Sequence, residues 1–198
     1  MTETRNSKSG EHSTKLRDGR RRVRYVVAMS LDGYIAGPDG EYDWIVMDPE
    51  IDFKSLFAQF DTLLMGRKTY DGFKSASGGM GSGMKVIVFS TTLDQKDSGN
   101  PEIVSTNPSH VIERLRSTVG KDIWLFGGGQ LFESLLELDL VDTVEVAVMP
   151  VLLGAGIPFL PSATSPKKLT LTNHRIYSTG IVSLEYSIGE ISTSTDRI

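Results

Sequence analysis

The sequence predicts a single α/β domain with a mostly parallel central sheet and an antiparallel C-terminal edge. Short β-branched apolar runs alternate with amphipathic helical patterns between residues 23 and 138, and this alternation is typical of parallel strands joined by crossover helices. The later segments TVEVAVMPVLL (143–153) and LTLTNHRIYSTGIVSLEYSI (169–188) have no helical pattern between them. Strands that follow each other in this way pair antiparallel, so they are expected to close the sheet.

The remaining elements follow from local patterns. Apolar runs rich in β-branched residues predict further strands at 23–30, 61–66, 85–90 and 122–129. Apolar residues at helical spacing predict helices at 50–60, from Arg67 onward, at 108–119 and at 130–138. The third helix is expected to present Val111, Ile112, Leu115 and Val119 on one face. Glycine and proline or serine predict loops at 30–44 and 75–83, the second of them mobile.

The two ends of the chain are polar and lack hydrophobic periodicity. We expect a flexible tail at 1–21, one folded domain at 22–189 and a short second tail at 190–198. The arginine cluster at this first boundary consists of Arg20, Arg21, Arg22 and Arg24. It is interpreted as solvated, with contact to an acidic partner as the alternative.

Composition excludes several classes of function. The formal net charge is −4, which offers no general attraction to nucleic acid or to an anionic membrane. The absence of cysteine excludes disulfides, zinc-thiolate sites and thiol catalysis. No apolar run approaches the roughly 20 residues of a membrane span, and the N-terminus has no apolar signal core. A cytoplasmic location is therefore expected.

Three segments carry candidate chemistry at the carboxyl ends of predicted strands. WLFGGGQLF (124–132) delivers three glycines to a helix start, where free N–H groups and close backbone approach suit a phosphate. LLMGRKTYDGF (63–73) places two cations and a hydroxyl at another helix start, and FSTT (89–92) adds hydroxyls after a strand. The alternatives are a ligand-free glycine turn, a surface basic pair and a capped turn. Because ligands gather at this edge of open α/β sheets, the three segments together favour a ligand site.

Other cofactor and catalytic motifs are missing from the sequence. No G-x-G-x-x-G follows the first strand, and the glycine triplet lacks the lysine of a P-loop. His12, His110 and His174 form no ligand pattern, so no metal site is predicted. Ser90 and Ser183 lack a nucleophile-elbow sequence, which disfavours covalent hydrolysis.

Taken in order, these segments resemble the dihydrofolate reductase superfamily. AMSLDGYIAGPDGEYDW (28–44) is similar to its first strand and active-site loop, LLMGRKTY to its cofactor segment, KVIVFST to its 2′-phosphate strand and DIWLFGGGQLFESLL to its glycine-triplet strand and helix. The resemblance implies a three-layer sandwich with helices on both faces of the sheet, and NADPH as cofactor. By position it implies cofactor contacts at Ala28, Ile35, Gly66, Arg67, Lys68, Thr69, Ser90, Thr91, Gly127, Gly128, Gly129, Gln130 and Leu131.

On the substrate side the sequence departs from true folate reductases. Pro49 stands where their acid is expected, Met84 where their folate-tail arginine is expected, and Ala147 near their supporting threonine. VMPVLLGAGIPFLP (148–161) instead resembles the C-terminal reductase domain of bacterial riboflavin-biosynthesis deaminase-reductases, in a stand-alone form. Those enzymes act on 5-amino-6-(5-phosphoribosylamino)uracil.

The leading hypothesis is therefore hydride transfer from NADPH to a small C=N or C=O substrate beside loop 30–44. Asp32, Asp48 and Glu50 are candidate catalytic residues for proton delivery or substrate hydrogen bonding. Asp32 could instead stabilise a turn, and Glu50 a helix start. The alternative functions are a divergent dihydrofolate or pterin reductase and a non-catalytic nucleotide-binding protein. The apolar late strands also predict a homodimer.

Overall fold

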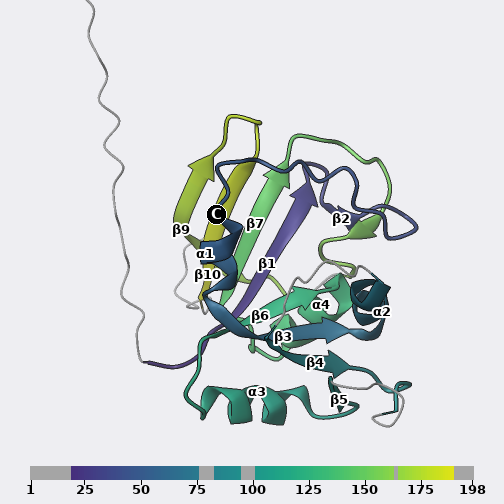
Figure 1. The fold of residues 1–198 in the computed structure, drawn as a ribbon, viewed down its shortest axis with the longest axis vertical. Coiled ribbons are helices and arrows are strands. Elements are labelled where there is room, and N and C mark those ends of the chain that lie inside the picture. Colours follow the sequence, from purple (N-terminus) through teal and green to yellow (C-terminus); the bar gives the residue numbers. More distant parts are fainter. Residues whose placement is uncertain (1–18, 76–82, 95–100, 163–164, 190–198) are drawn as a thin grey trace, which may run out of the picture.

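A computed structural model describes residues 19–75, 83–94, 101–162 and 165–189. Residues 1–18 of the tail expected at 1–21, which include His12, lie outside these ranges, as do the tail expected at 190–198 and residues 76–82 of the loop expected at 75–83. The described chain forms an eight-stranded sheet in the order β5-β4-β3-β6-β1-β7-β10-β9. The sheet is strongly twisted: β9, β7 and β1 run upward in Figure 1 with β10 antiparallel among them, whereas β6, β3 and β4 run across the view.

The strand directions confirm the predicted mostly parallel sheet with an antiparallel edge. The parallel strands are β1 (Val23–Ser30), β3 (Phe60–Gly66), β4 (Lys85–Phe89), β5 (Glu102–Val104), β6 (Asp122–Gly127) and β7 (Thr143–Met149). The antiparallel edge is formed by β10 (Val182–Gly189) and β9 (Lys168–Ile176). A small second sheet joins β2 (Tyr34–Ala36) to β8 (Ile157–Pro158).

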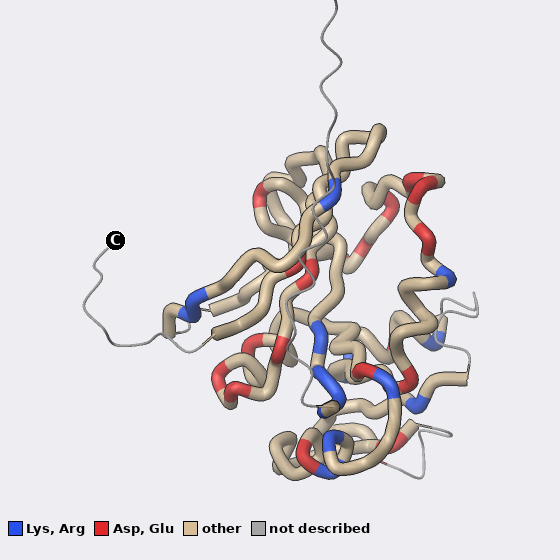
Figure 2. Tube along the Cα trace, turned by 90° about the vertical axis from the view of Figure 1, so that its left-hand side faces the viewer, with Lys and Arg blue, Asp and Glu red and all other residues tan. Residues whose placement is uncertain are grey.

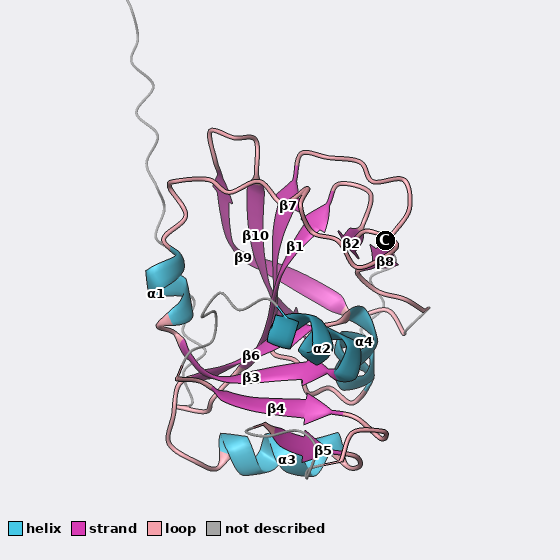
Figure 3. Ribbon diagram, turned by 45° about the vertical axis from the view of Figure 1, so that its right-hand side comes forward, coloured by secondary structure: helices cyan, strands magenta, loops and turns pink. Residues whose placement is uncertain are grey.

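Helices cover both faces of the sheet and complete the three layers. Two apolar clusters show this arrangement. The helices α3 (Pro108–Arg116) and α4 (Gly129–Glu137) pack on one face, with Phe132 stacked on Tyr25 of β1. On the other face, α1 (Phe53–Phe57) and α2 (Arg67–Ser75) pack around Trp124 of β6. Figure 3 shows the sheet between these helices.

Several predicted boundaries require correction. The helix expected at 50–60 is shortened to α1, because Pro49 disfavours a helical Asp48 and the Asp52 carboxylate caps the helix by accepting from Ser55 N. Val119, expected on the apolar face of α3, lies beyond the helix end and is fully exposed. The short strands β2, β5 and β8 were not predicted, since two or three residues give too little periodicity.

The arginine cluster belongs to the fold: Arg21 and Arg24 are buried and not solvated as expected, whereas Arg20 and Arg22 are partly exposed. Arg21 is 7% exposed and donates to Asp61, Thr62 and Lys121 O. Arg20 pairs with Asp142, Arg22 with Asp122, and Arg24 with Glu145 and Asp122. The expected domain boundary at residue 22 is therefore too late. The acidic partner of these arginines is this chain itself.

One further observation concerns membranes. Among the described residues, no helix combines the length and apolar character needed for a membrane crossing.

Candidate functional site

The three segments predicted to bind phosphate meet at one edge of the sheet. In the register of the parallel strands, Gly66 at the end of β3 lies opposite Phe89 at the end of β4. On its other side, β3 pairs Met65 with Gly127 at the end of β6. The carboxyl ends of β3, β4 and β6 are therefore neighbours, as expected from their parallel pairing.

The helices α2 and α4 begin at this edge, side by side in Figures 1 and 3. A Cβ built on Gly128 would lie 3.4 Å from Thr69 Oγ1, and one built on Gly127 would lie 4.0 Å from it. The hydroxyl at the start of α2 thus lies beside the backbone that opens α4. The first N–H groups of a helix have no intrahelical partner, so two sets of amide donors converge here.

The glycines at this edge differ in what surrounds them, and one of the three in the triplet is explained by packing. Gly127 has φ 137°, a backbone conformation that favours glycine, and its peptide bond to Gly128 is cis. Next to Gly66 a Cβ would meet nothing within 4 Å, so the backbone there borders open space. A Cβ on Gly129 would lie 2.7 Å from Pro158 O. Gly129 is therefore required by the close approach of the chain after β8.

The side chains at this edge differ in their availability. Lys68 is exposed, whereas Arg67 donates from Nε to Asp71 at 2.7 Å. Gln130 is exposed, but Leu131 lies in the core. A ligand could therefore reach Leu131 through its backbone alone.

The hydroxyls after β4 are arranged mainly as a turn. Ser90 is 8% exposed, and its Oγ accepts from the backbone N–H groups of Thr92 and Leu93 at 3.2 and 3.0 Å. This is the capped-turn alternative stated above. Thr91 is exposed at the same edge, so it is the more accessible of the two predicted 2′-phosphate contacts.

Next to the glycine edge, formed by the carboxyl ends of β3, β4 and β6, small side chains form a row across the sheet, here called the small-residue row. Ala28 of β1 lies opposite Ala147 of β7, which lies opposite Ser183 of β10. These residues share the sheet face on which α1 packs, because Val26, two residues before Ala28, belongs to the cluster around Trp124. Ile35, predicted to contact the nicotinamide, is half-buried on β2.

The candidate acid Asp32 holds two distant segments together. Its carboxylate accepts from Ser30 Oγ at 2.7 Å, from Leu153 N at 3.1 Å and from Gly154 N at 2.7 Å. The Ser30 hydrogen bond, helped by the two amides, lowers the pKa of Asp32 to about 2. The group is therefore ionised at neutral pH, which favours a role in positioning over proton delivery.

The other two candidate acids connect the segment before α1 with the β9–β10 turn. Asp48 is buried, accepts from Thr179 Oγ1 at 2.7 Å and from Glu50 N at 2.8 Å, and has a lowered pKa, chiefly because of the Thr179 hydroxyl. Glu50 accepts from Arg175 at 2.8 Å. Both carboxylates thus bind the β9–β10 hairpin, which contributes Ser183 to the small-residue row.

The segment between Arg24 and Lys54 is acidic. It contains no Lys or Arg, and its carboxylates are Asp32, Asp39, Glu41, Asp43, Asp48, Glu50 and Asp52. It forms the red-rich, upper right part of the trace in Figure 2. Since Arg67 and Lys68 lie at the glycine edge, opposite charges flank the small-residue row. This separation favours an anionic ligand at α2 over one at the acidic segment.

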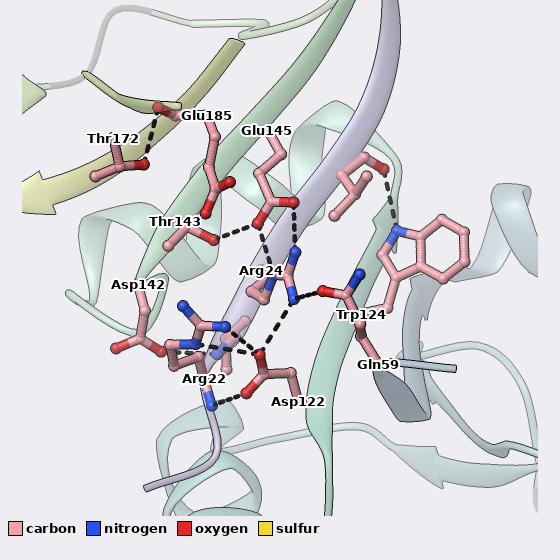
Figure 4. Close-up of polar contacts among 12 residues, drawn as sticks. Arg22, Arg24, Gln59, Asp122, Trp124, Asp142, Thr143, Glu145, Thr172 and Glu185 are labelled. Atoms are coloured by element: carbon pink, nitrogen blue, oxygen red, sulfur yellow. Dashed lines mark hydrogen bonds and ion pairs between the residues drawn. The ribbon is translucent and has the colours of Figure 1, made fainter. Parts of the chain in front are cut away.

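The sequence did not single out the carboxylates below the small-residue row. Arg24 is 4% exposed and donates to both oxygens of Glu145 at 2.6 Å. Glu185 lies opposite Glu145 in the β7–β10 register, and Figure 4 shows the two side chains close together. Burial and the charge of Glu145 raise the pKa of Glu185. The available signal was a single charged residue within each of three otherwise uncharged strands: Arg24 in β1, Glu145 in β7 and Glu185 in β10.

Metal chemistry finds no support in the described part of the chain. No group of three or more His, Asp or Glu side chains there could hold a metal ion.

Comparison with known proteins identifies relatives of this chain. The family model described as the RibD C-terminal domain matches residues 21–183. The YyaP protein of Bacillus subtilis is 33% identical over 178 residues, which cover 84% of this chain and 94% of that protein. A protein from Shewanella sp. PV-4 assigned to riboflavin biosynthesis is 25% identical, with a TM-score of 0.74 over 85% of this chain and 99% of its own.

More distant structures establish the fold alone. The deaminase/reductase of Thermotoga maritima is 20% identical, with a TM-score of 0.64 over 86% of this chain and 57% of that longer one. Dihydrofolate reductase from Enterococcus faecalis is 16% identical, with a TM-score of 0.63 over 85% of this chain and 97% of its own. The predicted dihydrofolate-reductase-like sandwich is thereby confirmed. With its family model covering most of the folded residues, the chain belongs to the RibD C-terminal domain family.

Proposed function

We propose that this chain is an NADPH-dependent reductase of the riboflavin-biosynthesis type, which transfers hydride to a small C=N or C=O substrate. The observation that carries the proposal is the meeting of two helix starts at one sheet edge, with Thr69 Oγ1 next to Gly128. The names of the relatives agree, since the Thermotoga maritima protein is a 5-amino-6-(5-phosphoribosylamino)uracil reductase.

The residues at this edge fit the phosphates of a dinucleotide. Open backbone at Gly66 allows close approach, the amides that open α2 and α4 would donate, and Lys68 would supply a cation. Thr91 and Ser90 would lie nearest an adenosine 2′-phosphate at the end of β4. This hydroxyl-bearing turn is the basis for proposing NADPH over NADH.

The chain itself would bind the cofactor and the substrate, orient them, and exclude water. The cofactor supplies a hydride when it is bound. Because Ala28, Ala147 and Ser183 have small side chains, the flat rings of the cofactor and the substrate could lie close to the sheet there. Asp32 fixes the segment 153–154, and Asp48 fixes the β9–β10 turn. We propose that these carboxylates position the walls of the substrate cleft, which contributes by orientation.

Binding of NADPH and NADH, followed by nicotinamide fluorescence, tests the cofactor site. We expect NADPH to bind more tightly than NADH, and Lys68→Ala to weaken NADPH binding about tenfold at low salt, a loss of about 1.4 kcal/mol. Lys74→Ala is the matched control, because Lys74 lies on the same helix but pairs with Asp71. If neither nucleotide binds the wild type, the proposal fails.

NADPH consumption distinguishes the possible reactions. Turnover with 5-amino-6-(5-phosphoribosylamino)uracil would support the proposed substrate class. Turnover with dihydrofolate would indicate a pterin reductase instead. Tight NADPH binding without turnover of any carbonyl, imine or pterin would indicate a nucleotide-binding protein.

A further inference from the structure

The small-residue row is accessible to solvent, although it lies within the sheet. Its strands β1, β7 and β10 are interior strands, each with a neighbour on both sides. Nevertheless Ala28, Ala147 and Ser183 are each only partly buried, so the helices of this face do not cover them completely. No hydrogen bond joins the Ser183 hydroxyl to another described residue. A ligand can therefore reach the row, and one hydroxyl there remains for it to contact.

Asp32 brings a negative charge to the β1 end of the row. Ser30, whose Oγ donates to Asp32 at 2.7 Å, lies two residues beyond Ala28 on the same face of β1. The other donors to this carboxylate are the backbone N–H groups of Leu153 and Gly154. All of these donors are neutral. Among the described residues, the charge of Asp32 thus has no cation bound to it.

Asp48 brings a second charge of this kind to the β10 end of the row. The buried carboxylate accepts from Thr179 Oγ1 at 2.7 Å and from Glu50 N at 2.8 Å. Thr179 lies in the turn that leads into β10, four residues before Ser183. A hydroxyl and a backbone amide orient the carboxylate, but neither neutralises it.

The cations of the cleft side are already neutralised. Arg175 lies opposite Ser183 in the β9–β10 register and donates to Glu50 at 2.8 Å. Arg24, near the start of β1, donates to both oxygens of Glu145 (Figure 4). The cations of α2 lie at the glycine edge, where the cofactor phosphates are proposed to bind. The two aspartates therefore leave an excess of negative charge beside the row, and this charge attracts a cation.

Aromatic side chains border the row on its β6 side. Phe126, at the carboxyl end of β6, is half-buried. Its ring lies edge-on to Trp124 and Phe73, with centroids 5.3 and 5.7 Å apart. Val26, two residues before Ala28 on the same face of β1, packs against this cluster. Aromatic rings attract cations as well as flat apolar molecules. Small, aromatic and acidic side chains together suit a flat, positively charged ring.

We propose that the substrate of this reductase is a flat cation that contains a C=N⁺ bond, an iminium ion, and not a ketone, an aldehyde or a phosphorylated compound. This inference rests on the proposed NADPH-dependent function. The substrate carbon would take a hydride from the reduced nicotinamide, and the π electrons of the C=N⁺ bond would move to nitrogen. The products are a neutral amine and NADP⁺, so no proton is needed.

A carbonyl substrate would make a different demand on the site. Hydride addition to C=O leaves an alkoxide, which must receive a proton. Asp32 and Asp48 have lowered pKa values, chiefly because of the Ser30 and Thr179 hydroxyls, so both are ionised at neutral pH. Ionised carboxylates stabilise a cationic substrate but supply no proton. The charge of the site thus agrees with the iminium reaction.

Calorimetry on the cofactor-free protein tests the charge preference with two bicyclic probes of similar size. One is an N-methylated dihydroisoquinolinium ion, and the other is the neutral ketone tetralone. The wild type is expected to bind the cation at least about tenfold more tightly. Asp32→Asn/Asp48→Asn, which keeps an acceptor oxygen at each site, should lose most of this preference and still bind tetralone. Glu113→Gln is the matched control, since it removes a carboxylate from α3, on the opposite face of the sheet.

Two further measurements complete the test. Raising the salt concentration should weaken binding of the cation to the wild type and leave tetralone binding unchanged, a result that depends on no variant. With NADPH present, the iminium should be reduced with a higher kcat/KM than tetralone. Equal affinities of the wild type for the two probes would overturn the proposal, as would a preference that survives the double substitution or faster reduction of tetralone.

The outcomes also separate this inference from the proposed function. Faster turnover of 5-amino-6-(5-phosphoribosylamino)uracil than of the iminium would overturn the cationic substrate and support the proposed function. A cation preference without any binding of NADPH would overturn the proposed function and leave a cation-binding site.

Discussion

Removing the Arg24 side-chain charge should be one of the most damaging single changes in this fold. Arg24 donates to both carboxylate oxygens of Glu145, to Gln59 at 2.7 Å and to Asp122 at 3.2 Å (Figure 4). Its guanidinium also lies 4.7 Å from the centre of the Phe60 ring. Arg24→Met keeps most of the apolar stem and removes the charge.

The expected magnitude follows from what is left behind. Glu145 and Asp122 would lose a buried cation, and Glu145 would still lie opposite Glu185. Breaking a buried ion pair by removing one partner costs about 3–5 kcal/mol. In a domain of this size 1 kcal/mol corresponds to about 2–4 °C in Tm, so the variant should melt roughly 6–20 °C below the wild type.

Thermal unfolding followed by circular dichroism at neutral pH is the assay. Arg114→Met serves as the control, because Arg114 forms a largely exposed ion pair with Glu102 whose loss should cost at most about 1 kcal/mol. Arg24→Met/Glu145→Gln should regain part of the loss, since one unpaired carboxylate is removed. If Arg24→Met melts within the range of Arg114→Met, the argument from the buried network is refuted.

Three further predictions concern single sites. Gly129→Ala should lower stability by about 1–3 kcal/mol, because its Cβ would lie 2.7 Å from Pro158 O. Gly128→Ala, whose Cβ would lie 3.4 Å from Thr69 Oγ1, should fold normally and lose NADPH binding. Equal melting temperatures of the two variants would contradict this. Asp32→Ala should be less stable than the wild type at pH 7, and the gap should close as pH falls from about 3.8 to about 2, since a lowered pKa stabilises the fold only while the group is ionised; a denaturation gap that is unchanged at low pH would exclude this origin. Tyr25→Phe should raise Tm, because the buried Tyr25 hydroxyl has no hydrogen-bond partner among the described residues; a lower Tm would indicate a partner such as bound water.

Much of the fold could be predicted because most of its longer strands correspond to short apolar runs in the sequence. β1 was expected at 23–30 and is found at Val23–Ser30, and α2 begins at the expected Arg67. Short elements were beyond the reach of periodicity, as β5 and β8 show. The fate of the N-terminal arginines could not be predicted either, because their carboxylate partners lie 40 to 122 residues away in sequence.

In the candidate site, too, some features could be predicted from local sequence and others could not. The meeting of the three segments at the glycine edge could be predicted, since parallel strands bring their carboxyl ends together whatever their side chains are. The roles of individual polar side chains depend on longer-range contacts. Asp32 binds Gly154 and Asp48 binds Thr179, at separations of 122 and 131 residues. Local spacing gave no access to these partners, so the sequence predicts proton delivery or substrate hydrogen bonding for these acids, whereas their contacts favour positioning.

The β9–β10 hairpin shows how one local irregularity decides which side chains can form long-range contacts. In the sequence LTLTNHRI (169–176), leucines and isoleucine stand at positions of opposite parity, which predicts an apolar residue on each face of the strand. The bulge at Thr172 reverses the alternation, and Thr172 Oγ1 donates to Glu185 O at 3.0 Å. Apart from His174, the paired polar residues of the two strands then face the cleft side, where Arg175 meets Glu50, and the large apolar residues face away. The face of the hairpin that meets Glu50 therefore depends on the one extra residue, Thr172.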